Sequence, residues 1–492
     1  MAILTVWHDG VCTQIPFAGT PRLDQVLESA GLLASRPCGG RGVCGKCAVA
    51  LEGAVSEPNA AELQAGTRLS CQAVLLADAV VRLPHSSATE QIQLESIGSL
   101  QIGTPMEGRL GAAIDIGTTT MALKLCELKS GRILSSAACL NPQTSVAADV
   151  MGRIGAAVDG RLSHLQAQAQ GAVESMLEQA CQEAGRSSCE ADTLVLTGNT
   201  TMLYLLTGRD PEALSHAPFR ADCLFGTETE LLGRRAYLPP CMNAFVGADI
   251  TCAVLASGMT GRKETALLCD IGTNGEIALW KDGTLYVTST AAGPAFEGAG
   301  ISCGCGSIRG AIDRVWIQDG VVQIHTIGEA PAVGICGSGL MDAVAAFLEL
   351  ERIDETGAVE ENSLPLSGMV ALLPRDIRAV QLAKAAIGAG IQTLLEAAGA
   401  HEEEVSAFYI AGGFGSHLNV ASAAAIGLIP ASLQDRVTVI GNGALAGALE
   451  LMLDQKKLRN AERVAAASQH LNLGGNPIFN ENYMEQMFFP KL

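Results

Sequence analysis

The spacing of apolar and polar residues predicts a small β-rich unit at the start of the chain. Apolar and polar side chains alternate through residues 2–7 and again through residues 11–16, on either side of a turn at residues 9–10, which predicts a β-hairpin. A helix is predicted next, with Thr20 as its cap and Pro21 as its first residue, because apolar residues then recur on one helical face. The chain therefore begins with a predicted ββα arrangement.

A second pattern begins after residues 86–108, which are polar, small and without clear period and are predicted to be a linker. Residues 112–125 read as an apolar strand, a turn of small residues and a second strand. The same pattern returns at residues 267–280, and the shared tetrapeptide DIGT begins at Asp115 and again at Asp270. This self-similarity predicts two copies of one structural unit.

Composition limits the classes of protein that the chain can represent. Its 492 residues predict about three folding units, and a content of 48% hydrophobic against 17% charged residues predicts a large core. The net charge of −19 argues against nucleic-acid and anionic-membrane partners. No apolar run is long enough to span a bilayer, and no secretory signal is visible, so we expect a cytoplasmic protein. In that compartment the 16 cysteines are expected as ligands or buried thiols rather than disulfides.

Four cysteines near the start of the chain are spaced as metal ligands. They follow the pattern C-x5-C-x2-C-x23-C, and the first three lie in the glycine-rich segment RPCGGRGVCGKC. Glycine allows backbone to approach an inorganic cluster closely, and the freed N–H groups can bond its sulfur atoms. A tetrahedral zinc site is the alternative, but zinc sites usually pair two C-x2-C units. The pattern favours a [2Fe–2S] cluster held by Cys38, Cys44, Cys47 and Cys71.

The surroundings of these cysteines agree with that interpretation. A ββα start, a cysteine loop and a closing strand near residues 80–83 resemble the β-grasp fold of [2Fe–2S] ferredoxins. The resemblance covers residues 1–85.

The repeated DIGT phrase has the chemistry of a phosphate-binding hairpin. Glycine permits close approach of the backbone, hydroxyl and N–H groups can donate to phosphate oxygens, and Asp115 and Asp270 can hold Mg²⁺ directly or through water. Two facing hairpins would clamp a nucleotide triphosphate. An ordinary hairpin is the alternative for either copy alone. The candidate phosphate-binding residues are Gly117, Thr118, Thr119, Gly272, Thr273 and Asn274.

Three further phrases place glycine or asparagine directly after an apolar strand. They are TLVLTGNTTMLYLL (193–206), FYIAGGFGSHLN (408–419) and VTVIGNGALAGALELML (437–453). Each is a common strand-to-helix loop when taken singly, and the glycine-rich turn of the second would let a flat adenosine lie against the backbone. The candidate nucleotide-binding residues in these phrases are Gly198, Asn199, Gly412, Gly413, Gly415, Gly441 and Asn442.

In this order the five phrases resemble the phosphate 1, connect 1, phosphate 2, adenosine and connect 2 motifs of the actin/Hsp70/sugar-kinase superfamily. The resemblance implies an α/β fold with a two-lobed RNase H-like ATPase domain, with lobe I at residues 109–247 and lobe II, including a C-terminal return segment, at residues 248–492. Ferredoxin module and ATPase domain together resemble the reductive activators of corrinoid-dependent methyltransferase systems. The segments GPAFEGAGISCG (293–304), GICGSGLMDAV (334–344) and MFFP (487–490) also match that family's pattern.

The resemblance implies candidate roles for four more residues. Asp249 stands where sugar kinases carry a general base, so it is a candidate to orient a hydrolytic water, although it can equally cap a helix over residues 250–257. Glu276 can hold a metal-bound water or be a solvated strand residue. Gly337 and Ser338 can contact phosphate, or simply begin a helix.

What the resemblance implies for function is ATP-dependent, one-electron reduction of a corrinoid protein from Co(II) to Co(I). The implied cofactors are a [2Fe–2S] cluster, ATP and Mg²⁺, and the implied partners are a corrinoid protein and an upstream electron donor, with the activator a monomer or homodimer. A small-molecule kinase or an ATP-binding redox sensor with an accessory cluster is the alternative. The chain passes almost directly from ferredoxin module to ATPase domain, so we expect it to lack the middle domain of the longest family members, which is implicated in dimer contacts.

Overall fold

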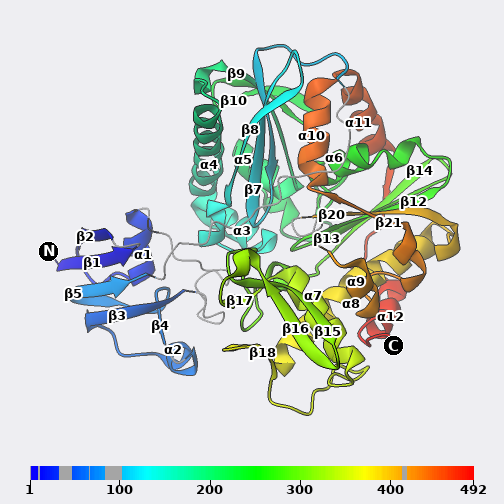
Figure 1. Cartoon of the computed structure of the whole chain (residues 1–492). Helices are drawn as coiled ribbons and strands as arrows, with labels where there is room; N and C mark the ends of the chain where they lie inside the picture. Colours follow the sequence, from blue (N-terminus) through cyan, green and yellow to red (C-terminus); the bar gives the residue numbers. More distant parts are fainter. Residues whose placement is uncertain are drawn as a thin grey trace.

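The computed structural model describes residues 2–8, 11–30, 32, 47–65, 67–83, 102–412 and 418–491. Within them the chain forms one small five-stranded sheet and two six-stranded sheets, in that order along the sequence (Figure 1). Strands β15 to β17 form a separate three-stranded sheet, and β18 and β19 form a two-stranded one. No helix among these residues has the length and apolar character needed to cross a bilayer.

The N-terminal module is built on a mixed sheet of strand order β2-β1-β5-β3-β4. The predicted hairpin is confirmed, because β1 pairs antiparallel with β2 and Ala2 lies opposite Phe17. Leu4 and Val6 are fully buried on the inner face of β1, as the alternation requires. The elements of this module are β1 (Ala2–His8), β2 (Val11–Phe17), α1 (Leu23–Ser29), β3 (Ala48–Val55), α2 (Ala60–Ala65), β4 (Arg68–Leu69) and β5 (Leu75–Arg82).

The predicted start of the first helix is wrong by two residues. Helix α1 begins at Leu23, with extended Arg22 as the residue before it and no cap from Thr20. The reason is tertiary, because the Pro21 carbonyl accepts from Leu75 N at 2.9 Å and Arg22 forms a β-bridge with Val74. These pairings hold the chain extended where proline alone would favour a helix start.

The first six-stranded sheet has the order β10-β11-β9-β6-β7-β8. Its central strand β6 is buried along its whole length except at half-buried Asp115, which is the pattern of a strand covered on both faces. The elements of this part are β6 (Leu110–Ile116), β7 (Thr120–Glu127), β8 (Arg132–Leu140), α3 (Val150–Ala156), α4 (Leu162–Glu183), β9 (Ala191–Gly198), α5 (Thr200–Thr207), β10 (Thr227–Leu231), β11 (Arg234–Leu238) and α6 (Ala248–Ser257).

The second six-stranded sheet has the order β21-β20-β12-β13-β14-β22. The elements of this part are β12 (Thr265–Ile271), β13 (Gly275–Lys281), β14 (Thr284–Thr290), β15 (Ala311–Gln318), β16 (Val321–Thr326), β17 (Gly334–Ile335), α7 (Gly337–Glu349), β18 (Leu364–Ser367), β19 (Val370–Leu372), α8 (Pro374–Ala397), β20 (Val405–Ala411), α9 (Val420–Ala425), β21 (Val437–Gly441), α10 (Gly443–Leu453), α11 (Lys456–Ala467), β22 (Ser468–His470) and α12 (Pro477–Glu485).

The predicted duplication is confirmed by the topology. In each large sheet three successive strands form an antiparallel meander, β6-β7-β8 and β12-β13-β14. In each, a later strand then pairs parallel with the first strand of the meander, β9 with β6 and β20 with β12. The two copies of DIGT therefore occupy equivalent positions, at the end of the first meander strand.

Two helices lie where the sheets meet, α6 and α10 (Figure 1). Helix α6 contributes Cys252 to a core shared with the first sheet and Ile250 to a core shared with the second. Helix α10 lies between β21 and β22 of the second sheet in the chain but packs on the first sheet, through Leu445 and Leu449. A Cβ atom on Gly447 of α10 would lie 2.0 Å from the Cys252 carbonyl oxygen, so the two helices cross in close backbone contact.

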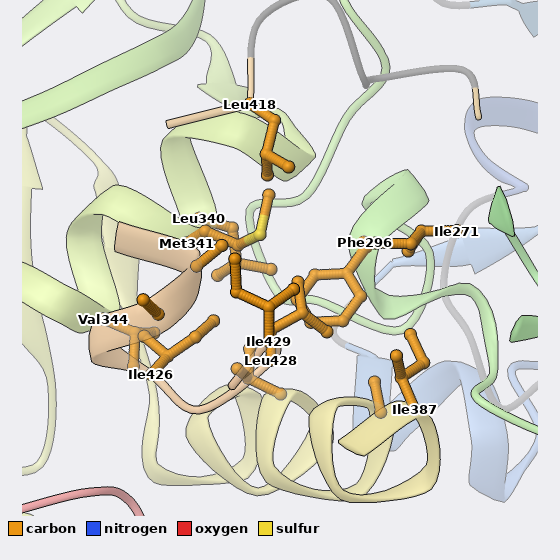
Figure 2. Packing of buried hydrophobic residues seen from close by; sticks show 14 of the residues in the cluster. Ile271, Phe296, Leu340, Met341, Val344, Ile387, Leu418, Ile426, Leu428 and Ile429 are labelled. Carbon is orange, nitrogen blue, oxygen red and sulfur yellow. The ribbon is translucent and has the colours of Figure 1, made fainter. Parts of the chain in front are cut away.

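The largest core lies beneath the second sheet, between helices α7 and α8. Figure 2 shows how Phe296, from the turn that follows β14, lies with its ring among aliphatic side chains that include Ile429 and Ile387. Phe296 is 1% exposed. This packing fixes the turn Pro294–Glu297 at the edge of the site described next.

Candidate functional site

Two of the four predicted cluster ligands lie side by side. Cys47 immediately precedes β3, Cys71 follows β4, and their Sγ atoms are 3.3 Å apart. The two side chains are 2% and 0% exposed. Thiols at this separation fit neighbouring ligands of one metal centre. Cys38 and Cys44 lie outside the described residues, and in the described part of the chain no three His, Cys, Asp or Glu side chains are placed to hold one metal ion together.

The second site is a cavity of about 200 Å³ between the turns of the two repeated hairpins. Most of the residues proposed from the sequence line it, and they come from seven separate parts of the chain when each hairpin is counted once. They are Asp115, Gly117, Thr118, Thr119, Asn199, Asp249, Asp270, Gly272, Thr273, Asn274, Glu276, Gly337, Gly412 and Asn442. The five phrases that are scattered along the chain therefore converge on one place.

Glycine is required at two of these positions. A Cβ atom on Gly117 would lie 2.5 Å from the Thr120 carbonyl oxygen, inside the tight turn of the first hairpin. Gly412, at the end of β20, has φ +119°, and a Cβ atom there would lie 2.4 Å from the Ile271 carbonyl oxygen. Both turns bring backbone to the edge of the cavity because no side chain intervenes.

Three predicted residues do not line the cavity. Gly198 is the last residue of β9 and pairs with Ile116. The Ser338 hydroxyl is turned away and donates to the Asp313 carbonyl at 2.9 Å, so the helix-start interpretation of Ser338 holds. The Gly441 carbonyl accepts from Gly412 N at 3.1 Å behind the site. Gly413 and Gly415 lie outside the described residues.

The two asparagines of the strand-to-helix phrases each cap a helix and donate a hydrogen bond to the first hairpin. Asn199 Oδ1 accepts from Met202 N and caps α5, while its Nδ2 donates to Thr118 Oγ1 at 3.0 Å. Asn442 caps α10 in the same way, and its Nδ2 donates to Asp115 Oδ2 at 2.9 Å. An amide can act as acceptor and donor at once, which a carboxylate cannot. Each helix start is thereby tied to the first hairpin.

Asp249 is not the cap of its helix, and Glu276 is not a solvent-exposed strand residue. Gly247 is the residue that precedes α6, and Asp249 is the second residue of the helix, where its Oδ1 accepts from Ile250 N at 2.9 Å. The interpretation of Asp249 as an N-cap is therefore wrong. Glu276 is 7% exposed, so it is not a solvated strand residue, and it lies directly opposite Asp270 across the β12–β13 pair.

The acidic residues of the cavity raise one another's pKa. Burial raises the pKa of Asp115 to about 6, against a hydrogen bond from Asn442 that lowers it. Burial and the charges of Asp115 and Glu297 raise the pKa of Asp270 to about 7. Burial and the charges of Asp270 and Asp115 raise the pKa of Asp249 to about 8. Burial also raises the pKa of Glu276. Such a cluster favours a cation or a proton at its centre.

Glu297 is a site residue that the sequence analysis did not single out. Its carboxylate lines the cavity and accepts from Thr119 Oγ1 at 2.6 Å and from Thr273 Oγ1 at 2.9 Å, and so touches both hairpins. Burial raises its pKa, partly offset by those hydrogen bonds. The signal that was available is the segment GPAFEGAGISCG, which contains it.

Arg153 of α3 is the second residue that was missed. It is fully buried, and its guanidinium donates to the Thr118 carbonyl behind the first hairpin, and to the Ala147 carbonyl at 3.0 Å. Burial lowers the pKa of Arg153 to about 9, while the charges of Asp149 and Glu297 act to raise it. No pattern in the sequence marks this arginine, because its bond to the first hairpin is to the backbone of Thr118, 35 residues earlier in the chain.

Fold and site together define the class: a [2Fe–2S] ferredoxin-like module followed by a two-lobed domain of the actin/Hsp70/sugar-kinase superfamily. Three family models agree. The model of the 2Fe-2S iron-sulfur cluster binding domain matches residues 8–76. The model of the RACo middle region matches residues 110–262, and the model of the C-terminal domain of RACo, the ASKHA domain, matches residues 264–492.

Individual relatives show to which family within this class the chain belongs. The chain is 33% identical over 418 residues to the corrinoid activation enzyme RamQ of Eubacterium limosum, covering 77% of this chain and 70% of the relative. It is 28% identical over 295 residues to the [Co(II) methylated amine-specific corrinoid protein] reductase of Methanosarcina barkeri, covering 55% and 54%. A solved reductive activator for a corrinoid, iron-sulfur protein aligns with a TM-score of 0.72 at 26% identity, over 99% of this chain and 98% of that one. The chain belongs to the family of reductive activators of corrinoid proteins.

The RACo middle region is not an extra domain between the ferredoxin module and the ATPase domain, because its model matches residues 110–262. That stretch is the one that builds the first six-stranded sheet. The middle region is thus present as the first half of the two-lobed domain.

Proposed function

We propose that this protein uses ATP to drive the one-electron reduction of a corrinoid protein from Co(II) to Co(I) in a methyltransferase system. The observation that carries the proposal is the presence in one chain of two adjacent buried thiols, Cys47 and Cys71, and of a two-hairpin cavity built from repeated phosphate-binding phrases. The printed names of the relatives, a corrinoid activation enzyme and a Co(II) corrinoid protein reductase, support the same activity.

The electron carrier in this proposal is a [2Fe–2S] cluster held by Cys38, Cys44, Cys47 and Cys71. When bound, such a cluster supplies one electron at a time. The 3.3 Å separation of two of these thiols fits the group, and their burial keeps water from the sulfur atoms. An upstream electron donor must reload the module between turnovers.

The ATP site in this proposal is the cavity between the hairpins. Thr118, Thr119 and Thr273 offer hydroxyl donors to phosphate oxygens, and Asn199 and Asn442 hold the first hairpin in place. None of the described residues that line the cavity is lysine, arginine or histidine, although five are acidic. An anionic triphosphate can enter such a site only with cations, which supports Mg²⁺ held by Asp115 and Asp270 through water.

Asp249 is the candidate to accept a proton from the attacking water. A general base works best when its pKa lies near the operating pH, and the pKa of Asp249 is raised to about 8 by burial and by the charges of Asp270 and Asp115. Burial and the charges of Asp249 and Asp270 in turn raise the pKa of Glu276, which lies opposite Asp270.

ATP is needed because the electron moves energetically uphill. Each gap of about 100 mV costs about 2.3 kcal/mol for one charge, or roughly fiftyfold in equilibrium. A nucleotide-linked change between two arrangements of the sheets can supply this bias if one arrangement binds the Co(II) partner and the other favours the Co(I) product. The shared helices α6 and α10 are the elements that such a change would move.

The test is anaerobic absorption spectroscopy of the reduced protein mixed with a Co(II) corrinoid protein, with and without ATP. We expect the Co(I) band to grow only with ATP, and Cys71→Ser to give no Co(I) while still binding ATP. Growth of the band at equal rate without ATP, or full activity of Cys71→Ser, would refute the proposal. Phosphate transfer to a small molecule without any corrinoid protein would instead identify a kinase.

A further inference from the structure

One carboxylate bridges the two repeated hairpins. Thr119 belongs to the first hairpin and donates to Glu297 Oε2 at 2.6 Å, while Thr273 of the second hairpin lies 3.0 Å and 2.9 Å from the two carboxylate oxygens. The two hydroxyl oxygens are themselves 3.3 Å apart. Glu297 is thus bound at the point where two phosphate-binding turns, 154 residues apart in sequence, come together.

The chain fixes Glu297 to the second sheet. It ends the turn Pro294–Glu297, whose Phe296 is buried in the core under that sheet (Figure 2). The backbone N–H of Gly293 also donates to the Thr273 carbonyl at 2.9 Å. The hydrogen bond between Glu297 and Thr119 is therefore a contact between the two halves of the domain, made at the cavity and not in their shared core.

The bridge uses hydrogen-bond donors that a phosphate would need. The cavity lining is rich in carboxylates, and the buried Arg153 lies behind the first hairpin with its guanidinium on the Thr118 carbonyl. A phosphate oxygen accepts hydrogen bonds as a carboxylate oxygen does. Two anions cannot share the same two hydroxyl donors, because their charges repel at this distance.

We propose that Glu297 is a positioning residue that latches the two hairpins together in the nucleotide-free protein, and that the terminal phosphate of ATP displaces it. This inference rests on the proposed function, since it assigns ATP to this cavity. ATP takes over the hydroxyls of Thr119 and Thr273 and breaks the Thr119–Glu297 bond. ADP lacks the terminal phosphate and leaves the latch closed. The latch thereby makes the contact between the halves depend on which nucleotide is bound.

The binding test compares Glu297→Gln with Glu264→Gln, an exposed control that removes the same charge before β12. Titration calorimetry uses the full chain, a non-hydrolysable ATP analogue with Mg²⁺, and ADP with Mg²⁺. We expect Glu297→Gln to lower the Kd of the ATP analogue about tenfold and that of ADP less than about threefold, because one like charge is removed from beside the terminal phosphate. Glu264→Gln should change neither value.

Weaker binding of the ATP analogue by Glu297→Gln, or an equal gain for ADP, would overturn the latch and leave the proposed function standing. A wild-type chain that binds no nucleotide would overturn both.

The second readout needs no nucleotide. In hydrogen–deuterium exchange, we expect peptides that contain residues 117–119 and 272–274 to exchange at least about threefold faster in nucleotide-free Glu297→Gln than in wild type, because local opening becomes easier. Thr119→Val removes the donor from the other half and should have the same effect, so it carries the test if Glu297→Gln does not fold. Unchanged exchange in the folded variants would refute a latch between the halves.

Discussion

Replacing Asp249 by asparagine should stabilise the nucleotide-free protein at alkaline pH, although Asp249 is a candidate catalytic residue. Burial, and then the charges of Asp270 and Asp115, raise the pKa of Asp249 from 3.8 to about 8. A carboxyl whose pKa is raised by folding is favoured in its protonated form, so the folded state loses stability as pH rises from about 4 through about 8. Asparagine keeps the acceptor for Ile250 N and cannot ionise.

The magnitude follows from the size of that shift. A rise of about four pKa units at about 1.4 kcal/mol each sets an upper limit of about 6 kcal/mol at high pH. The carboxylate is half-buried and faces a cavity that admits water, and its acidic neighbours release part of the repulsion by taking up protons. We therefore expect Asp249→Asn to gain about 2 kcal/mol at about pH 8, which is about 2–3 °C in Tm for a domain of this size. The gain should shrink as the pH falls toward about 5.

The assay is anaerobic thermal unfolding without nucleotide and with a chelator, since bound Mg²⁺ would itself neutralise the acidic residues of the cavity. Asp435→Asn is the matched control, because it removes an exposed carboxylate of the turn Ala431–Arg436. An Asp249→Asn variant that melts at the wild-type temperature at about pH 8, or whose gain is the same at about pH 5, would refute the electrostatic reasoning.

Three further outcomes are expected. Cys71→Ser should lose the visible absorption of the cluster after anaerobic reconstitution while its Kd for ATP, measured by calorimetry, stays as in wild type. Gly447→Ala should lower the free energy of unfolding by about 1–3 kcal/mol, because the new Cβ atom would lie 2.0 Å from the Cys252 carbonyl oxygen. Gly171→Ala is the control on helix α4, where the new Cβ atom meets open space, and it should raise the free energy of unfolding by up to about 1 kcal/mol. Equal shifts in the two variants would contradict the close crossing of α6 and α10. Chelating Mg²⁺ should weaken ATP binding at least about hundredfold, because five acidic residues line the described cavity without a lysine, arginine or histidine, and unchanged affinity would exclude the proposed metal.

The sequence was sufficient to predict the fold because its signals were local and repeated. Each DIGT phrase lies in its own strand–turn–strand pattern, so the equivalence of Asp115 and Asp270 could be inferred before the sheets were seen. Asn199 and Asn442 were also visible, since a residue that follows an apolar strand and opens a helix falls at the edge of the sheet. The cysteine spacing likewise needed no tertiary information.

What could not be predicted depends on contacts between distant parts of the chain. Glu297 bonds to Thr119 across 178 residues, and no periodicity or spacing marks a lone glutamate at the end of a short turn. The start of α1 was misplaced for a similar reason, because backbone pairing of Pro21 with Leu75 overrides a good local helix signal. Local propensity is a weak guide wherever a tertiary partner competes for the same backbone group.

The path of helix α10 explains how a change at the phosphates can reach the rest of the molecule. Asn442 caps this helix and at the same time bonds to Asp115, which lies at the end of the central strand of the first sheet. Any ligand that moves Asp115 or changes its charge therefore acts on the start of α10 directly. Because α10 crosses α6 with backbone contact at Gly447, and α6 packs on both sheets, the helix cannot shift without moving one sheet against the other. A small rearrangement around a bound phosphate would thus reach both halves of the domain, and the proposed nucleotide-driven electron transfer needs such a connection.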